Sequence, residues 1–142
     1  MKFISKIYSA LIVLSCLAVI SLSLYAAEEK PLADIIANPD KAVLCIDLKS
    51  IDHSHIVEDG FILFYMRNKK IYLNALPNTC PGLKSADTFM YRLSIHRLCN
   101  VDVITVLYRM AGGFYPGPSC GLGLFYPVDK QIAKEISTRS KK

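Results

Sequence analysis

The segment FILFYMRNKKIYLNAL, residues 61–76, contains two apolar runs that flank a short polar turn. The runs FILFYM (61–66) and KIYLNAL (70–76) are rich in the aromatic and branched residues that favour strands. Between them, Arg67, Asn68 and Lys69 form a polar break of the length found in hairpin connections. The segment therefore predicts a β-hairpin.

Further strand-like runs lie on both sides of this hairpin, and a Gly- and Pro-rich stretch separates the last two. The runs are VLCID (residues 43–47), TFMYRL (88–93), VDVITVLY (101–108) and LGLFY (122–126). The stretch AGGFYPGPSCGLG (111–123) is expected to be a long turn, because its glycines permit positive φ and its prolines stiffen the chain. About six short strands predict an antiparallel barrel or a curled sheet.

Two segments have apolar residues at helical spacing. KPLADIIANPDK (30–41) predicts a short N-terminal helix that ends near Asn38-Pro39, and VDKQIAKEIS (128–137) predicts a C-terminal helix. The fold class expected from the whole pattern is α+β, a small β-rich domain with one helix near each end. Because no internal repeat or linker-like stretch interrupts it, residues 27–142 are interpreted as a single domain.

The N-terminus has the order of a secretory signal peptide. Lys2 and Lys6 form a basic start, an apolar run covers residues 7–25, and the small residues Ala26 and Ala27 precede a charged segment. Residues 1–26 are therefore predicted to be a signal peptide, and the mature chain to be periplasmic or secreted. Two alternatives stay open: an uncleaved membrane anchor, because the run is long enough to span a bilayer, and lipidation at Cys16.

The charge balance is mild. The 142 residues carry 17 Lys and Arg against 12 Asp and Glu, a formal net charge of +5, which falls to +3 when Lys2 and Lys6 leave with the signal peptide. A charge this small does not indicate a nucleic-acid partner. Membrane contact is expected only through the signal segment.

Four cysteines remain in the mature chain, Cys45, Cys80, Cys99 and Cys120, and an even number in an exported protein predicts two disulfides. Zinc binding by four cysteines is not expected, because the chain has no C-x-x-C pair. Three pairings are possible. We favour Cys80 with Cys99, which bracket one predicted strand, and Cys45 with Cys120, which would tie the ends of the domain together.

The run Asp52-His53-Ser54-His55 is the one cluster with metal-ligand character. An H-x-H pair on an extended strand places both imidazoles on one face, and His96, Glu58 or Asp59 would have to supply a third ligand. The favoured interpretation is instead a solvated polar loop between two strands. No cofactor is predicted.

Catalytic signatures are weak in this sequence. No G-x-S-x-G elbow accompanies His96, so a serine nucleophile is not predicted. Asp102, at the entrance of a predicted strand beside Cys99, is interpreted as a cap or turn hydrogen-bond acceptor, with an active acid as the alternative. We assign no catalytic residue.

The chain resembles a family of small exported bacterial proteins known only as a domain of unknown function. The matching residues run from Cys45 to about Phe125: FYMRNKKIYLNAL at 64–76, C-P-G-L at 80–83, Leu98-Cys99 with Asp102 and Ile104, and C-x-L-G-x-F at 120–125. The resemblance implies an exported four-cysteine domain and supplies no activity, cofactor or catalytic residue. Val101 departs from it, because a small residue or glycine is usual before the aspartate.

The function predicted from these features is a binding or envelope-support module whose partner is an unidentified protein or envelope ligand. The first alternative is an inhibitor of an envelope-directed hydrolase, with the loop 111–119 as the presented element, because small disulfide-stapled β domains present rigid loops to partners. The second is a metal-dependent enzyme built on His53 and His55.

Overall fold

The computed structural model describes residues 30–92 and 96–140, and the predicted signal peptide (1–26) with Cys16 lies outside these ranges. The chain divides into the units Met1–Asp34 and Ile35–Lys142, and the three sheets lie in the second unit. The helical segments in the described residues are α2 (Lys30–Ile36), η1 (Pro39–Lys41), η2 (Leu48–Ser50), α3 (Leu83–Ala86) and α4 (Lys130–Arg139). The strands are β1 (Cys45–Asp47), β2 (Ile51–Glu58), β3 (Phe61–Met66), β4 (Ile71–Ala75), β5 (Phe89–Tyr91), β6 (Arg97–Cys99), β7 (Val103–Met110), β8 (Gly113–Gly121) and β9 (Phe125–Val128).

The predicted central hairpin is confirmed. Strands β3 and β4 pair antiparallel from Phe61 opposite Ala75 to Tyr65 opposite Ile71. In the turn, the Asn68 side chain accepts a hydrogen bond of 3.1 Å from the backbone N–H of Lys70, and Lys69 takes a left-handed conformation with φ 66°. An asparagine that bonds the backbone two residues on is a local turn device, so the turn is specified by its own sequence.

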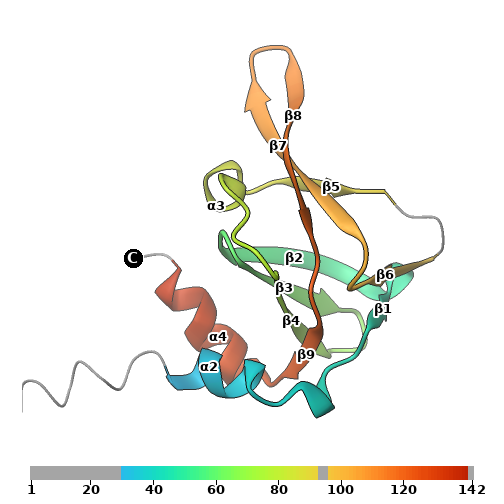
Figure 1. Ribbon diagram of the computed structural model, residues 1–142, viewed down its shortest axis with the longest axis vertical. Coiled ribbons are helices and arrows are strands. Elements are labelled where there is room, and N and C mark those ends of the chain that lie inside the picture. Colours follow the sequence, from blue (N-terminus) through green and yellow to red (C-terminus); the bar gives the residue numbers. More distant parts are fainter. Residues whose placement is uncertain (1–29, 93–95, 141–142) are drawn as a thin grey trace, which may run out of the picture. The chain divides into compact units, whose positions relative to one another are not determined.

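The strands form three antiparallel sheets rather than one closed barrel, and with the helices at both ends they confirm the α+β class. One sheet has the order β2-β3-β4-β9, a second β5-β7-β8, and the third is the pair β1-β6. Figure 1 shows the β7–β8 hairpin extending away from the strands of the other sheets. Long-range pairings such as β4 with β9 join segments about fifty residues apart.

Four strands depart from the prediction. β2 contains Asp52, His53 and Ser54, which we interpreted as loop residues; it lies at the edge of its sheet, where polar side chains face solvent. β8 was predicted as a long turn, and β6 was not predicted at all. The predicted 122–126 strand lies later, at Phe125–Val128.

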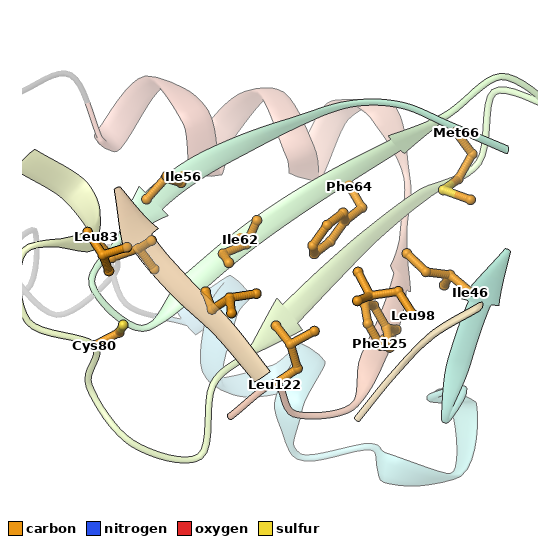
Figure 2. Close-up of a cluster of buried hydrophobic side chains, with 12 residues drawn as sticks. Ile46, Ile56, Ile62, Phe64, Met66, Cys80, Leu83, Leu98, Leu122 and Phe125 are labelled. Atoms are coloured by element: carbon orange, nitrogen blue, oxygen red, sulfur yellow. The ribbon is translucent and has the colours of Figure 1, made fainter. Parts of the chain in front are cut away.

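The main core lies between the inner face of the four-stranded sheet and the two smaller sheets. Its buried side chains come from seven helices and strands and from two loop positions, and they are Ile46, Ile56, Ile62, Phe64, Met66, Cys80, Leu83, Leu98, Ile104, Val106, Leu122 and Phe125. Phe64 and Phe125 both belong to this cluster (Figure 2). Their ring centroids lie 5.6 Å apart, and the ring planes meet at 62°. This is the edge-to-face arrangement that aromatic rings prefer.

The other face of the four-stranded sheet is covered by α4. Because strand side chains alternate, Leu63 and Tyr65 point away from the core that holds Ile62 and Phe64. The Tyr65 hydroxyl lies 3.4 Å from that of Ser137 in α4. The helix begins with Asp129, whose carboxylate accepts a hydrogen bond of 2.9 Å from the backbone N–H of Ile132, an N-cap that fixes where the helix starts. The predicted C-terminal helix is confirmed with its start moved two residues on.

One buried polar side chain fastens the segment before β9 to β4. Asn74 is fully buried; its amide donates to the carbonyl of Gly123 at 2.7 Å and accepts from the N–H of Gly123 at 3.1 Å. A Cβ on Gly123 would lie 1.9 Å from the carbonyl oxygen of Ala75. Only glycine allows this approach of two backbones, which explains the glycine in the motif at 120–125.

The chain forms two disulfides, and the pairing that we favoured is wrong. Cys45 bonds Cys99, with Cα atoms 4.0 Å apart, and Cys80 bonds Cys120, with Cα atoms 5.8 Å apart. Strand β6, absent from the prediction, places Cys99 directly opposite Cys45 in the β1–β6 pair. Cys80 instead bonds Cys120, which lies opposite Ile104 of β7.

Two disulfides in a domain of this size are typical of an oxidising, extracellular compartment. Within residues 30–92 and 96–140, no helix is both long and apolar enough to cross a membrane.

Candidate functional site

The most prominent surface feature is the outer half of the β7–β8 hairpin, residues 107–116, which we call the finger. The two strands pair from Leu107 opposite Pro116 to Met110 opposite Gly113, and Ala111 and Gly112 close the turn. Gly112 and Gly113 have φ values of 107° and 139°, which only glycine adopts readily. The stretch predicted as a long turn is therefore a tight hairpin end followed by a strand whose register against β7 shifts once, between Thr105 and Leu107 (Figure 1).

Three large apolar side chains stand exposed at the end of the finger. Met110 is 59% exposed, Phe114 51% and Tyr115 49%, and we call these three residues the tip patch. Register and alternation place Arg109 and Phe114 on one face of the hairpin, and Met110 and Tyr115 on the other. The tip is therefore apolar on both faces.

The finger is anchored at its base by a tyrosine held between two glycines. Cβ atoms added to Gly82 and Gly117 would lie 2.3 Å and 2.4 Å from the ring or hydroxyl of Tyr108. Gly82 belongs to the C-P-G-L motif and has φ 80°, so both its backbone conformation and its missing side chain are used. The Tyr108 ring thereby fixes β7 against the turn before α3.

A disulfide adds a covalent anchor at the same end of the hairpin. Cys120 in β8 bonds Cys80, which is fully buried, and the N–H of Cys80 donates to the carbonyl of Asp59 at 2.6 Å. Farther out, the hydroxyls of Thr105 and Ser119 lie 2.8 Å apart across the hairpin. The finger therefore projects from a base that is fixed to the core by packing, by a disulfide and by cross-strand contacts.

Strand β8 is the outer strand of its sheet, and two prolines interrupt its free edge. Pro116 and Pro118 lack the backbone N–H that would pair with an added strand. Prolines at such an edge protect it from edge-to-edge association. A partner of the finger is therefore expected to contact its side chains rather than extend its sheet.

His53 and His55 both lie on β2, as an H-x-H pair on a strand requires, and they line a shallow depression of about 280 Å³ with Ser54, Tyr65 and Ser137. The His53 ring stacks on that of Tyr65, with centroids 4.4 Å apart, and its Nδ1 lies 2.8 Å from a carboxylate oxygen of Asp52. The interpretation of this run as a loop is wrong.

The proposed third ligands do not join the two histidines. The Asp59 carboxylate accepts a hydrogen bond of 2.7 Å from the backbone N–H of Lys84, at the start of α3. The backbone carbonyl of His96 accepts from Leu48 near β1 and β6. Across the described parts of the chain, no three His, Cys, Asp or Glu side chains are grouped so that they could hold a metal ion.

The carboxylate of Asp47 holds a turn by accepting hydrogen bonds from the next residues along the chain. The Ser50 hydroxyl donates to the carboxylate of Asp47 and is the main cause that holds the pKa of Asp47 below its usual value. A lowered pKa in the folded state gives stability at pH values above the unfolded-state pKa, and this stability is lost as the pH falls through the folded-state pKa. Asp47 is fully exposed, so its carboxylate stabilises only the turn formed with Lys49 and Ser50.

The interpretation of Asp102 as a turn acceptor is confirmed. Its carboxylate accepts a hydrogen bond of 2.6 Å from the N–H of Cys99, and its own N–H donates to the carbonyl of Cys99 at 3.0 Å. Val101, 81% exposed, occupies the turn without a positive φ. The tight turn therefore forms although Val101 departs from the small residue that the resemblance leads one to expect.

We expect Asp102→Ala to lower the free energy of unfolding by about 1–2 kcal/mol, because the N–H of Cys99 loses its acceptor in a half-buried turn. Urea unfolding followed by far-ultraviolet circular dichroism measures this. An unchanged unfolding midpoint would contradict the interpretation of Asp102 as the acceptor that holds this turn.

Residues Arg109 and Met110 were not singled out from the sequence. They follow a predicted strand. The strand that pairs with them was not predicted, because the glycines and prolines of 111–119 are typical of a turn. The motifs that carry the family resemblance serve the scaffold in this structure: Cys80 and Cys120 form a disulfide, Leu83, Leu122 and Phe125 are core residues, and Gly82 and Gly123 permit close contacts.

Comparison with protein-family models, with curated proteins and with solved structures gives no match to this chain. The resemblance to a family of small exported proteins therefore stays a prediction.

Proposed function

We propose that the mature chain is a protein-binding module of the periplasm or the extracellular space, and that the finger is its contact element. The observation that carries this proposal is the tip patch: Met110, Phe114 and Tyr115 stand 49–59% exposed at the end of an anchored hairpin. Large apolar side chains gathered at one exposed place mark interaction sites in soluble proteins.

The chemistry of the finger supports a protein as the partner. Aromatic residues, methionine and arginine are the residue types enriched in protein interfaces, and aromatic residues and arginine carry much of the binding energy there. The tip patch and Arg109 supply all of these types within seven residues. The anchored base lowers the entropy lost when the finger is held by a partner.

Binding also fits the described side chains better than catalysis does. The carboxylates of Asp47, Asp59, Asp102 and Asp129 each accept hydrogen bonds that hold a turn or begin a helix. These four carboxylates therefore stabilise the fold. In this proposal, nucleic acid is not a partner, and membrane contact is confined to the signal segment.

The native size of the protein in an envelope extract tests the proposal. We expect the wild-type protein to elute from a gel-filtration column as part of a larger complex, and the double variant Phe114→Ser/Tyr115→Ser to elute as the free domain. The matched control is Val101→Ser, because Val101 is also apolar and is 81% exposed but lies away from the finger. Retention of the double variant in the complex, or release of the control, would contradict the proposal.

Export predicts a defined new N-terminus. Sequencing of the mature protein should give Ala27 or Glu28 as the first residue, because the small residues at 26 and 27 follow the apolar run. An intact Met1 in the membrane fraction would assign the segment to an anchor. A lipid on Cys16 would assign the protein to the lipoproteins.

A further inference from the structure

We infer that the partner is a glycoside hydrolase, that the finger occupies its active-site cleft, and that Arg109 pairs with the carboxylates there. This inference rests on the proposed function and specifies its partner. Arg109 is the only charged residue between Asp102 and Asp129, so the finger carries one cation among apolar and uncharged side chains.

The position of Arg109 makes its charge part of any interface. Its guanidinium carbon lies 5.4 Å from the centroid of the Phe114 ring, and the two residues are opposite one another in the hairpin register. A partner that covers Phe114 therefore also removes the guanidinium from water. A charge that is removed from water without a counter-charge is strongly unfavourable, so the partner must offer an anion.

The Phe114 ring also orients the Arg109 guanidinium for binding an anion. A guanidinium held over an aromatic face keeps its planar N–H groups free at its edge. These donors match the two oxygens of a carboxylate in a paired, fork-like geometry that lysine does not offer. Because the proposed partner is a protein, the expected counter-charge is the carboxylate of an Asp or Glu side chain.

The shape of the finger indicates that the partner binds it in a cleft. Phe114 and Met110 lie on opposite faces of the hairpin, so one flat surface cannot cover both. At the very end, Gly112 and Gly113 have no side chains, which leaves a narrow leading edge. The tip patch is covered only when walls stand on both sides of the finger.

Glycoside hydrolases combine these two properties. Most of them flank the scissile bond with two Asp or Glu residues roughly 5–10 Å apart. The cleft between them is open to a polymeric substrate. A finger seated there would place one guanidinium against the two carboxylates and exclude the substrate without any covalent step.

Inhibition of purified lysozymes, which are glycoside hydrolases of the cell-wall glycan, tests the inference. The panel consists of three lysozymes with different folds, with a serine protease of similar size as the negative control. We expect the mature protein to inhibit at least one lysozyme competitively with a dissociation constant of about 1 μM or tighter, and to leave the protease unaffected.

Charge variants then test the assigned contact. Arg109→Glu should weaken inhibition about 100-fold, because it places a carboxylate against carboxylates, and Arg109→Lys about 10-fold, because the charge stays and the fork is lost. The matched control is Arg67→Glu, an exposed arginine in the β3–β4 turn, which should inhibit like the wild-type protein.

Absence of inhibition across the panel, or full inhibition by Arg109→Glu, overturns this inference. The proposed function fails by a different result, the retention of Phe114→Ser/Tyr115→Ser in the envelope complex. If the complex depends on the finger but no lysozyme is inhibited, the proposed binding function holds and the assignment of the partner as a glycoside hydrolase is wrong.

Discussion

Replacing Cys80 and Cys120 together with alanine should lower the free energy of unfolding by up to about 4 kcal/mol. The disulfide closes a loop with a sequence separation of 40, and the chain-entropy account assigns roughly this value to a loop of that size. Small domains are stabilised by only about 5–15 kcal/mol, so this loss is a large share. Because the chain has no tryptophan, urea unfolding is best followed by circular dichroism.

The second disulfide provides the matched control. The pair Cys45→Ala/Cys99→Ala opens a loop with a separation of 54 and should lower stability by a similar amount. Only the loss of Cys80–Cys120 should increase amide hydrogen exchange in β8, because of the two disulfides only this one links a residue of β8 to the core. Similar exchange of β8 in both double variants would contradict the anchoring function of Cys80–Cys120.

The single change Cys80→Ala should be tolerated less well than the double change. It leaves Cys120 as a free thiol that can pair wrongly in an oxidising compartment. Complete reduction of the wild-type protein should lower the melting temperature strongly or prevent folding. An unchanged melting temperature after reduction would contradict the claim that the disulfides stabilise the fold.

Gly123→Ala should lower the free energy of unfolding by about 3–5 kcal/mol. The added Cβ would lie 1.9 Å from the carbonyl oxygen of Ala75, a backbone atom that can move only if β4 moves. Separation of the two segments would also break both hydrogen bonds of Asn74 and leave its buried amide unsatisfied, which costs about 1–3 kcal/mol.

Gly121→Ala is the control for this substitution, because nothing lies within 4 Å of a Cβ built there and its φ is not left-handed. Its effect should stay within about 1 kcal/mol. Equal unfolding midpoints for the two variants would show that the close approach at Gly123 does not limit stability.

The parts of the fold that were predicted correctly are those with strong local signals. The β3–β4 hairpin combines two apolar runs with a turn whose Asn68 bonds its own backbone, and the apolar spacing in α4 is helical. In both, neighbouring residues decide the structure. The class α+β follows from these local elements alone.

The strands that were missed lack such signals. β8 contains glycines and prolines and is held as a strand by pairing with β7 and by Cys120. β2 has polar residues because it is an edge strand, and β6 is only three residues long. The disulfide pairing failed for the same reason, since Cys99 meets Cys45 through β6.

The segment 111–119 was named from the sequence only as the presented loop of the inhibitor alternative. The exposed end of the finger lies within and just before this range. That Arg109 faces Phe114, and that the tip is apolar on both faces, depends on the register of β7 and β8. A register set by tertiary contacts is not visible in a single sequence.

Site-specific photo-crosslinking in living cells tests most directly the claim that the finger is the contact element. A photoreactive phenylalanine analogue is placed in turn at position 114, on the finger, and at position 101, which is exposed but lies away from the finger. We predict one discrete adduct with an envelope protein from position 114 and none from position 101. Adducts of equal yield from both positions, or from position 101 alone, would contradict this account.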